Sequence, residues 1–433
     1  MFEKLSVKID GGYDCDFPEL VPVEQYFAGQ ALAQIEKTID EELGKKGILD
    51  QIKPGQRIAV AVGSRGIDNL RTIVRHVIEN IKRQGGYPFI VPAMGSHGGA
   101  DPEGQREILK AYGISEDTMA VPVLSGMEVV ELGTFEAGVP VYIDKHAFEA
   151  DGIVIINRVK AHTDFKAAFE SGLMKMLVIG LGNHRGATAV HAMGFDRFHR
   201  LIPEIGKVIL AKAKVLFGVA IIENAENKTA RIEAVAAKDF AWREPQLLLE
   251  AKNLMPRIIP RGFDVLVVEE IGKDISGSGM DPNVVGRHGS GLPGFDGPSY
   301  QRLVVFDLTE KSHGNACGIG MADVTTRDLV NKINFNDLYA NCITAANLNP
   351  ARIPVVMKSE QEALAVAIKT CYRVTVPEAR IVFIKNTLSL KKILVSQPLW
   401  EEIKTNPDVK QIGPSQPMIF DKAGRLLLRP SQL

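Results

Sequence analysis

One lysine and two histidines stand close together in this sequence, between residues 162 and 191. Lys175 follows His162 by thirteen positions, and His191 follows Lys175 by sixteen. Lys175 lies among glycines and apolar residues in the segment FESGLMKMLVIG, where an ammonium group is costly to bury unless it is paired or used chemically. An amine combined with imidazoles is typical of covalent attachment and of metal binding.

Alternating strands and helices are predicted in both halves of the chain. Apolar residues between 68 and 83 recur at spacings of three and four, which predicts an amphipathic helix. Buried strands are expected at residues 57–62, 89–92, 152–157, 264–269, 303–307 and 380–384. We therefore expect an α/β fold with two domains, parallel or mixed sheets, and an active-site cleft between the domains. Residues 1–260 would carry the catalytic and cofactor-anchoring residues, and residues 261–433 would close the cleft.

Polar loops follow three of the expected strands. Arg65 comes after the first strand, His97 lies in a glycine-rich loop after the second, and His162 comes after the strand at 152–157. Because the carboxyl ends of parallel strands meet at one edge of a sheet, we expect these loops to form one active site.

Composition limits the class of protein. The chain has 433 residues and a formal net charge of −1, so no basic field is present that would gather nucleic acid or an anionic membrane. No secretory signal and no long apolar run is visible, which favours a cytoplasmic protein without a membrane span. The four cysteines are far apart and form no zinc, iron–sulfur or disulfide pattern. The composition is compatible with a homo-oligomer.

Each candidate residue also has an ordinary structural interpretation. Arg65 could hold a carboxylate or phosphate, or cap a turn. Lys175 could form a Schiff base, anchor another group or bind phosphate, or it could extend from a helix end to solvent. His97 and His162 could transfer protons or make structural hydrogen bonds. A metal could be bound by His191, and spacing alone does not prefer it over His184 or His199.

Taken in order, the five residues resemble the pattern of the nickel-dependent lactate racemase family. The set is Arg65, His97, His162, Lys175 and His191, with gaps of 32, 65, 13 and 16. The resemblance covers most of the chain, and its motifs lie in the N-terminal half. It implies a nickel-pincer nucleotide attached covalently at Lys175, nickel bound by His191, and His97 and His162 as catalytic residues on opposite sides of the substrate.

The same resemblance implies further contacts and partners. Arg65, Ser64 and Gly98 would bind the cofactor, and Arg65 could instead hold the substrate carboxylate. Apart from the resemblance, Lys273 lies in a long glycine-rich stretch, where it could face the cleft and bind the substrate or belong to a structural loop. Partners would be the enzymes that synthesise the cofactor and a small-molecule substrate, and the apo protein would lack the nickel group. The expected activity is a racemase or epimerase acting by reversible hydride transfer.

Differences from the family pattern surround the expected substrate site. Val62 replaces an aspartate, Gly66 replaces a proline after the arginine, and Gly98 replaces an arginine after the histidine. The segment between His162 and Lys175 is also longer than usual. These differences favour a related 2-hydroxy acid, including a sugar acid, over lactate itself.

Two other classes of protein fit the same residues. A metal-dependent hydrolase or lyase could bind zinc or iron through His97, His162 and His191, with Asp164 and Asp196 nearby in the sequence. A non-catalytic protein could bind a small anion through Arg65 and helix N-termini.

Overall fold

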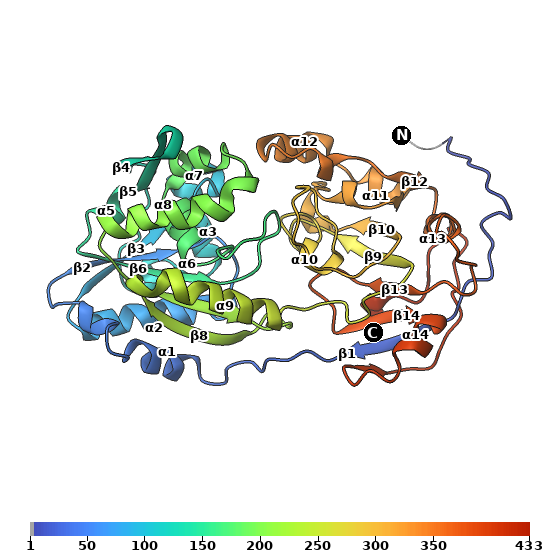
Figure 1. Ribbon diagram of the computed structural model, residues 1–433, viewed down its shortest axis with the longest axis horizontal. Coiled ribbons are helices and arrows are strands. Elements are labelled where there is room, and N and C mark those ends of the chain that lie inside the picture. Colours follow the sequence, from blue (N-terminus) through green and yellow to red (C-terminus); the bar gives the residue numbers. More distant parts are fainter. Residues whose placement is uncertain (1–3) are drawn as a thin grey trace. The chain divides into compact units, whose positions relative to one another are not determined.

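The computed structural model describes residues 4–433, and the chain forms two compact units. Unit 2 contains residues 28–255, and unit 1 combines residues 1–27 with residues 256–433. Figure 1 shows both units, each with a sheet and surrounding helices. The predicted α/β fold class is confirmed.

Unit 2 is built on a five-stranded sheet in the order β3-β2-β6-β7-β8. The first three pairings are parallel, and β8 is antiparallel to β7. The strands are β2 (Arg57–Val62), β3 (Tyr87–Pro92), β6 (Gly152–Arg158), β7 (Val215–Glu223) and β8 (Thr229–Ala236). A separate hairpin is formed by β4 (Val129–Phe135) and β5 (Val139–Asp144).

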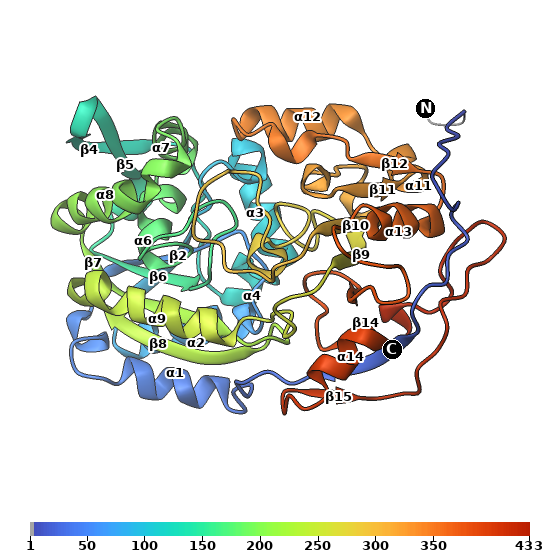
Figure 2. The same ribbon diagram turned by 45° about the vertical axis from the view of Figure 1, so that its right-hand side comes forward.

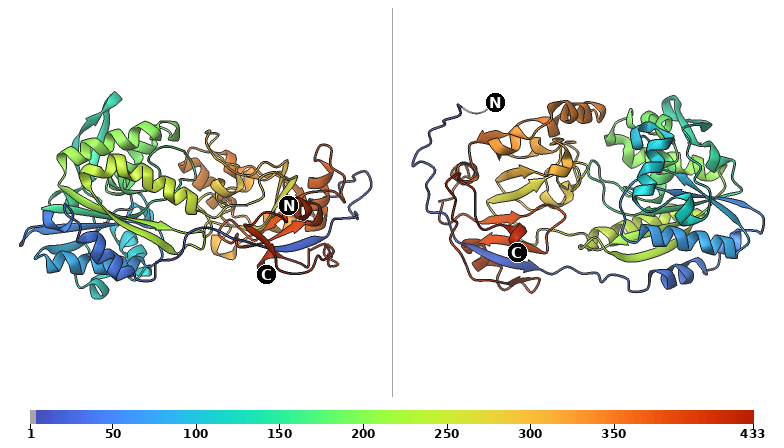
Figure 3. Two further views of the ribbon diagram at one scale, coloured as in Figure 1. Left: turned by 60° about the horizontal axis from the view of Figure 1, so that its bottom comes forward. Right: turned by 180° about the vertical axis from the view of Figure 1, so that it is seen from behind.

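The helices of unit 2 cover both faces of this sheet. They are α1 (Ile35–Leu43), α2 (Leu70–Arg83), α3 (Pro102–Ala111), α4 (Glu116–Met119), α5 (Lys145–Phe148), α6 (Leu173–Lys175), α7 (Asn183–His191), α8 (Phe198–Lys212) and α9 (Phe240–Leu254). Apolar residues of α1 to α4 share one core with the sheet, and α1 and α2 lie side by side (Figure 3).

The second face of the sheet is covered at β7 by α6 and α9. Phe217 and Val219 of β7 belong to the core with α1 to α4, so the intervening Gly218 faces the other way. Gly218 lies against the side chains of Leu173 from α6 and Phe240 from α9. Figure 2 shows α9 running beside β8. The position of α6 is therefore set by the sheet below it and by α9.

Unit 1 has an eight-stranded mixed sheet in the order β12-β11-β10-β9-β13-β14-β1-β15. Its strands are β1 (Leu20–Gln25), β9 (Val265–Ile271), β10 (Arg302–Leu308), β11 (Val324–Thr326), β12 (Val355–Met357), β13 (Ile381–Ile384), β14 (Lys392–Ser396) and β15 (Val409–Gln411). Its helices are α10 (Pro282–Val285), α11 (Arg327–Asn331), α12 (Phe335–Thr344), α13 (Glu360–Lys369) and α14 (Gln397–Ile403).

The N-terminal segment departs from the expected continuous domain of residues 1–260. β1 pairs antiparallel with β14 and β15, so it is an inner strand of the unit 1 sheet, drawn in blue beside the red strands in Figure 1. Val21 and Val23 of β1 are fully buried in the core of that unit. The chain passes from unit 2 back to unit 1 between residues 255 and 256, close to the expected domain boundary after residue 260.

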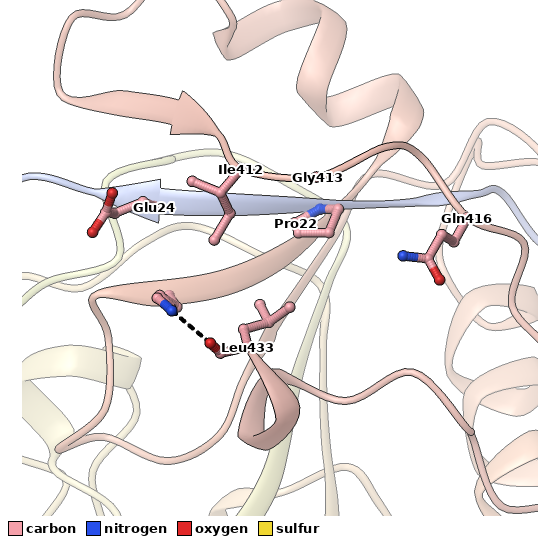
Figure 4. A pocket seen from close by; sticks show the side chains of 7 residues that line it. Pro22, Glu24, Ile412, Gly413, Gln416 and Leu433 are labelled. Atoms are coloured by element: carbon pink, nitrogen blue, oxygen red, sulfur yellow. Dashed lines mark hydrogen bonds between the residues drawn. The ribbon is translucent and has the colours of Figure 1, made fainter.

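Unit 1 also contains an open cavity of about 550 Å³ next to β1. Figure 4 shows its lining and the hydrogen bond from Lys392 Nζ to the Leu433 oxygen. The lining residues are Pro22, Glu24, Lys392, Ile412, Gly413, Gln416 and Leu433. None of them is a predicted site residue. In the described part of the chain, the helices are too short or too polar to cross a membrane.

Candidate active site

Three neighbouring parallel strands deliver the predicted residues to one edge of the unit 2 sheet. In the order β3-β2-β6, the loop after β2 carries Arg65, the loop after β3 carries His97, and the segment after β6 carries His162. The strands are parallel, so all three loops leave from the same edge. The strand order places the three loops at one edge, and their forming one active site stays a prediction.

The segment bearing Lys175 packs directly on the loop of His97. After α6 the chain forms a π-helix, Met176–Gly180, and then α7, which ends at His191. The amide of Gly95 donates a hydrogen bond of 3.0 Å to the Gly180 carbonyl. Gly95 has φ of +60°, and a Cβ atom there would lie 3.1 Å from the Ile179 oxygen. A glycine is therefore needed where this loop meets the π-helix.

The amine of Lys175 meets the imidazole of His162. Lys175 Nζ lies 2.5 Å from His162 Nε2. On the other side of the ring, Nδ1 accepts a hydrogen bond of 3.0 Å from the Asp164 amide. An Nδ1 atom that accepts carries no proton, so neutral His162 holds its proton on Nε2, facing the amine. A neutral amine can accept that proton in a hydrogen bond, whereas an ammonium cannot.

The pKa values of both groups are lowered, so the site favours their uncharged forms more than water does. Burial lowers the pKa of Lys175 to about 8, the nearby Asp164 carboxylate opposes this shift, and Arg65 adds to it. The pKa of His162 is held well below its ordinary value, first by burial and then by the positive charges of Lys175 and Lys166. A lysine with this pKa is a far better nucleophile near neutral pH than a surface lysine.

Glu170 fixes the loop that presents His162. Its carboxylate is fully buried and accepts the His162 amide at 2.6 Å. Two lysines neutralise it: Lys166 Nζ at 3.2 Å, and Lys252 Nζ of α9 at 2.6 Å. A buried carboxylate with three such donors holds the loop in one conformation.

His191 carries its lone pair on Nε2. Its Nδ1 atom lies 2.7 Å from the Ala187 carbonyl, which can only accept, so the Nδ1 proton is fixed and Nε2 is left as a possible metal ligand. The ring contacts Phe195 and Phe198, at centroid distances of 5.7 and 5.4 Å. Phe195 also packs near His162, at 6.2 Å. One aromatic cluster therefore supports both imidazoles.

Arg65 and His97 join this group through the β2 loop. Ser64 Oγ is 2.5 Å from His97 Nδ1, and the Ser64 carbonyl accepts from Tyr112 at 3.0 Å. Partial burial and the positive charge of Arg158 lower the pKa of Arg65, although much of its surface is exposed. The charge of Arg65 in turn lowers the pKa values of His162 and Lys175. An anion beside Arg65 would relieve this positive field.

Other predicted residues have different positions. Gly98, with φ of +70°, lies against the backbone of Gly104 in α3 next to His97. Lys273 belongs to unit 1, where its Nζ donates to the Gly277 carbonyl at 2.6 Å and to Asn341 Oδ1 at 2.7 Å. His184 and His199 are exposed, and His199 Nδ1 lies 2.7 Å from the Asp196 carbonyl. The roles of these residues in binding stay predictions.

Two supporting carboxyl groups were not identified from the sequence as part of the site. Glu170 lies within the lysine segment itself, and its position among apolar residues was the available signal. Glu244 of α9 accepts the Met174 amide at 2.9 Å, next to Lys175 in the chain. Its distance of seventy positions from Met174 gave no signal.

The residues present fit a tethered nickel-pincer nucleotide. A buried amine with a lowered pKa suits an amide-type tether, the Nε2 lone pair of His191 suits Ni(II), and the guanidinium of Arg65 suits an anionic group. Among the side chains of the described residues 4–433, no group of three or more His, Cys, Asp or Glu could hold a metal ion alone. The pincer group would bring its own sulfur and carbon ligands, so one imidazole from the protein is enough.

The fold and the site together define a two-unit α/β protein with a lysine–histidine centre at the edge of a mostly parallel sheet. Residues 17–200 match the lactate racemase N-terminal domain, and this range contains Arg65, His97, His162, Lys175 and His191. This part of the chain therefore matches the lactate racemase N-terminal domain, in agreement with the resemblance seen in the sequence.

Comparison with solved structures supports the same fold. The chain is similar to the structure of the lactate racemase apoprotein from Thermoanaerobacterium thermosaccharolyticum, with a TM-score of 0.54 and 14% sequence identity. The similarity covers 85% of this chain and 99% of that one. At this identity the likeness shows the fold alone. Comparison with curated protein sequences gave no match.

Proposed function

We propose that this protein is a racemase or epimerase of a 2-hydroxy acid, such as a sugar acid, and that it carries a nickel-pincer nucleotide on Lys175. The observation that carries the proposal is the contact of the Lys175 amine with His162 Nε2, in a site that lowers the pKa of the amine to about 8. Such an amine is suited to becoming the nitrogen of a covalent tether at neutral pH.

Each residue has a role that follows from its surroundings. Lys175 would hold the cofactor covalently, and His191 would bind nickel through Nε2, since its Nδ1 faces the Ala187 carbonyl. When bound, this cofactor supplies a reversible acceptor for the hydrogen on C2 of the substrate. Arg65 would hold an anionic group of the cofactor or the substrate carboxylate, with Ser64 and Gly98 lining the same loops.

The two remaining imidazoles are the proposed proton carriers. His97, fixed by Ser64, and His162, fixed by the Asp164 amide, would each exchange a proton with the substrate hydroxyl. Removing the hydroxyl proton while the C2 hydrogen leaves as hydride gives a planar 2-oxo acid. Return of the hydride to the opposite face of C2, and of a proton to the oxygen, inverts C2. Inversion at one carbon needs a proton carrier for each face, which two histidines provide.

Turnover by the loaded protein tests this function. Protein co-produced with the cofactor-synthesis enzymes should interconvert the two C2 isomers of at least one 2-hydroxy acid in a panel of simple and sugar acids, followed by chiral chromatography. His97→Ala should remove this activity and keep the cofactor. The matched control is His199→Ala, an exposed histidine outside the proposed proton-transfer pair, which should remain active. A fully loaded protein that interconverts no member of the panel would contradict the proposal.

A further inference from the structure

The carboxyl group of Glu244 caps the short helix that carries Lys175. Helix α6 begins at Leu173, and its N-cap residue Gly172 has no side chain that could accept from the first amides. Glu244, from α9, takes that place: its Oε2 accepts the Met174 amide at 2.9 Å, and the Leu173 amide also donates to this carboxyl. A residue seventy positions away thus supplies the missing cap.

Glu244 is an unusual residue for a capping role because it is buried. Only 1% of its surface is exposed, and burial raises its pKa to about 8 in spite of the two amide donors. Its second oxygen, Oε1, has no hydrogen-bond partner within residues 4–433. Burying a polar group with an unpaired oxygen costs free energy. Its presence here therefore indicates that its contacts with α6 have a role.

Gly172 provides the space that this carboxyl occupies. Its φ of 175° is extended backbone that any residue adopts, so conformation does not require a glycine. A Cβ atom at this position, however, would lie 2.1 Å from Glu244 Oε1 and 2.8 Å from its carboxyl carbon. A side chain at residue 172 would displace the cap. Glu244 and Gly172 therefore act as one unit.

The same helix and the neighbouring strand hold the surroundings of Lys175. Asn157, in β6, donates from Nδ2 to the Gly172 carbonyl at 2.8 Å. Lys252, two turns after Glu244 in α9, holds Glu170 and hence the His162 loop. The amine and the imidazole that it contacts are thus fixed from one helix, α9.

We propose that Glu244 is a positioning residue, which caps α6 through the Leu173 and Met174 amides and so keeps the Lys175 amine against His162 Nε2. It acts through the backbone and does not contact the amine. The inference rests on the proposed function in one respect, that Lys175 is the reactive amine of the site. Its consequence is that the nucleophilicity of Lys175 depends on a residue in a different helix.

The test measures the reactivity of Lys175 in the apo protein, so no cofactor is needed. Acetylation by limiting acetic anhydride is followed by mass spectrometry from pH 6.5 to 10.5, with the exposed Lys207 as internal reference. In the wild-type protein the reaction of Lys175 should have its midpoint near pH 8. In Glu244→Ala the midpoint should rise by about one unit or more, which lowers the neutral amine at pH 7 about tenfold.

The conservative variant separates positioning from general stability. Glu244→Gln keeps a carbonyl oxygen for the Met174 amide and should leave the midpoint near that of wild type. Glu250→Ala, in the same helix but paired with Arg231 and Arg243, is the matched control and should also leave it unchanged. Of these three variants, only Glu244→Ala should accelerate hydrogen exchange at the Leu173 and Met174 amides.

A double-mutant cycle with Gly172 completes the test. Gly172→Ala should raise the midpoint of the Lys175 reaction by displacing the carboxyl. The double variant Gly172→Ala with Glu244→Ala should raise this midpoint no further than Glu244→Ala alone. If Glu244→Ala does not fold, the midpoints of Gly172→Ala and Glu244→Gln still test whether the cap positions Lys175. An unchanged midpoint in Gly172→Ala or in folded Glu244→Ala would overturn this inference alone. A wild-type Lys175 that reacts like Lys207 would instead count against the proposed function.

Discussion

His162 Nε2 and Lys175 Nζ lie 2.5 Å apart, and when both groups are neutral the proton between them lies on the imidazole. This assignment follows from the far side of the ring, where Nδ1 accepts the Asp164 amide. Geometry and burial thus both favour the neutral form of the amine, and its pKa is lowered to about 8. Lys175 is the proposed covalent anchor, and the histidine beside it is itself a proposed proton carrier.

The tautomer of His162 can be measured directly. Nitrogen NMR of the imidazoles should show His162 neutral, with its proton on Nε2, from pH 6 to 8, because burial and Lys175 keep its pKa well below 6.5. Below pH 6.5 the unfolded chain gains a proton on this residue before the folded chain does. The free energy of unfolding should therefore fall as the pH falls through this range. Titration of His162 near 6.5 would contradict the assignment.

Glu244 should make the free energy of unfolding depend on pH in the direction opposite to His162, and Glu244→Gln should remove this dependence. The pKa of Glu244 is about 8 in the folded protein against 4.5 in an unfolded chain. Between these values the folded protein keeps a proton that the unfolded chain has lost, so wild-type stability falls as the pH rises. Relative to wild type, the variant should gain up to about 1.4 kcal/mol per pH unit in this window. Urea unfolding at pH 5, 6.5 and 8 measures the difference, and a constant difference would refute the prediction.

Removing the charge of Glu170 should destabilise unit 2. In Glu170→Gln, the amines of Lys166 and Lys252 lose the carboxylate that neutralises them, and leaving a buried charge unpaired costs about 3–5 kcal/mol. The control is Glu204→Gln, which breaks the exposed pair with Lys207 and should cost about 0–1 kcal/mol. Equal losses in the two variants, measured by urea unfolding, would show that Glu170 is not a structural centre of the loop.

His191→Ala should separate the tether from the metal. Lys175 is intact in this variant, so the mass increase at residue 175 should persist while the nickel content per chain falls severalfold or more. His184→Ala and His199→Ala are the controls, since the alternatives in the sequence included both, and they should keep nickel. Metal analysis alongside peptide mapping gives both readouts. Loss of nickel in His199→Ala with retention in His191→Ala would reassign the ligand.

The strand-end residues could be predicted because their signal is local. Apolar runs identified β2, β3 and β6, and the rule that parallel strands end at one edge brought Arg65, His97 and His162 together. Lys175 and His191 were identified by residue type and spacing. In each case a short stretch of sequence determines both the element and the position of the side chain at its end.

The remaining features depend on contacts between distant segments. Nothing near Glu244 indicates that it reaches Met174, because only the packing of α9 on β7 and β8 brings them together. β1 has a strand pattern that cannot reveal its partner, β14, more than 360 positions later. The tautomers of His162 and His191 follow from single backbone atoms, the Asp164 amide and the Ala187 carbonyl, which a sequence does not place.

Intact-protein mass spectrometry after co-production with the cofactor-synthesis enzymes tests the central claim most directly. The wild-type protein should gain the mass of the nickel-pincer nucleotide, peptide mapping should place it on Lys175, and nickel should be present at about one per chain. Lys175→Ala should gain neither, and Lys207→Ala should gain both. An unmodified Lys175 without nickel, under conditions that load a lactate racemase, would contradict the account.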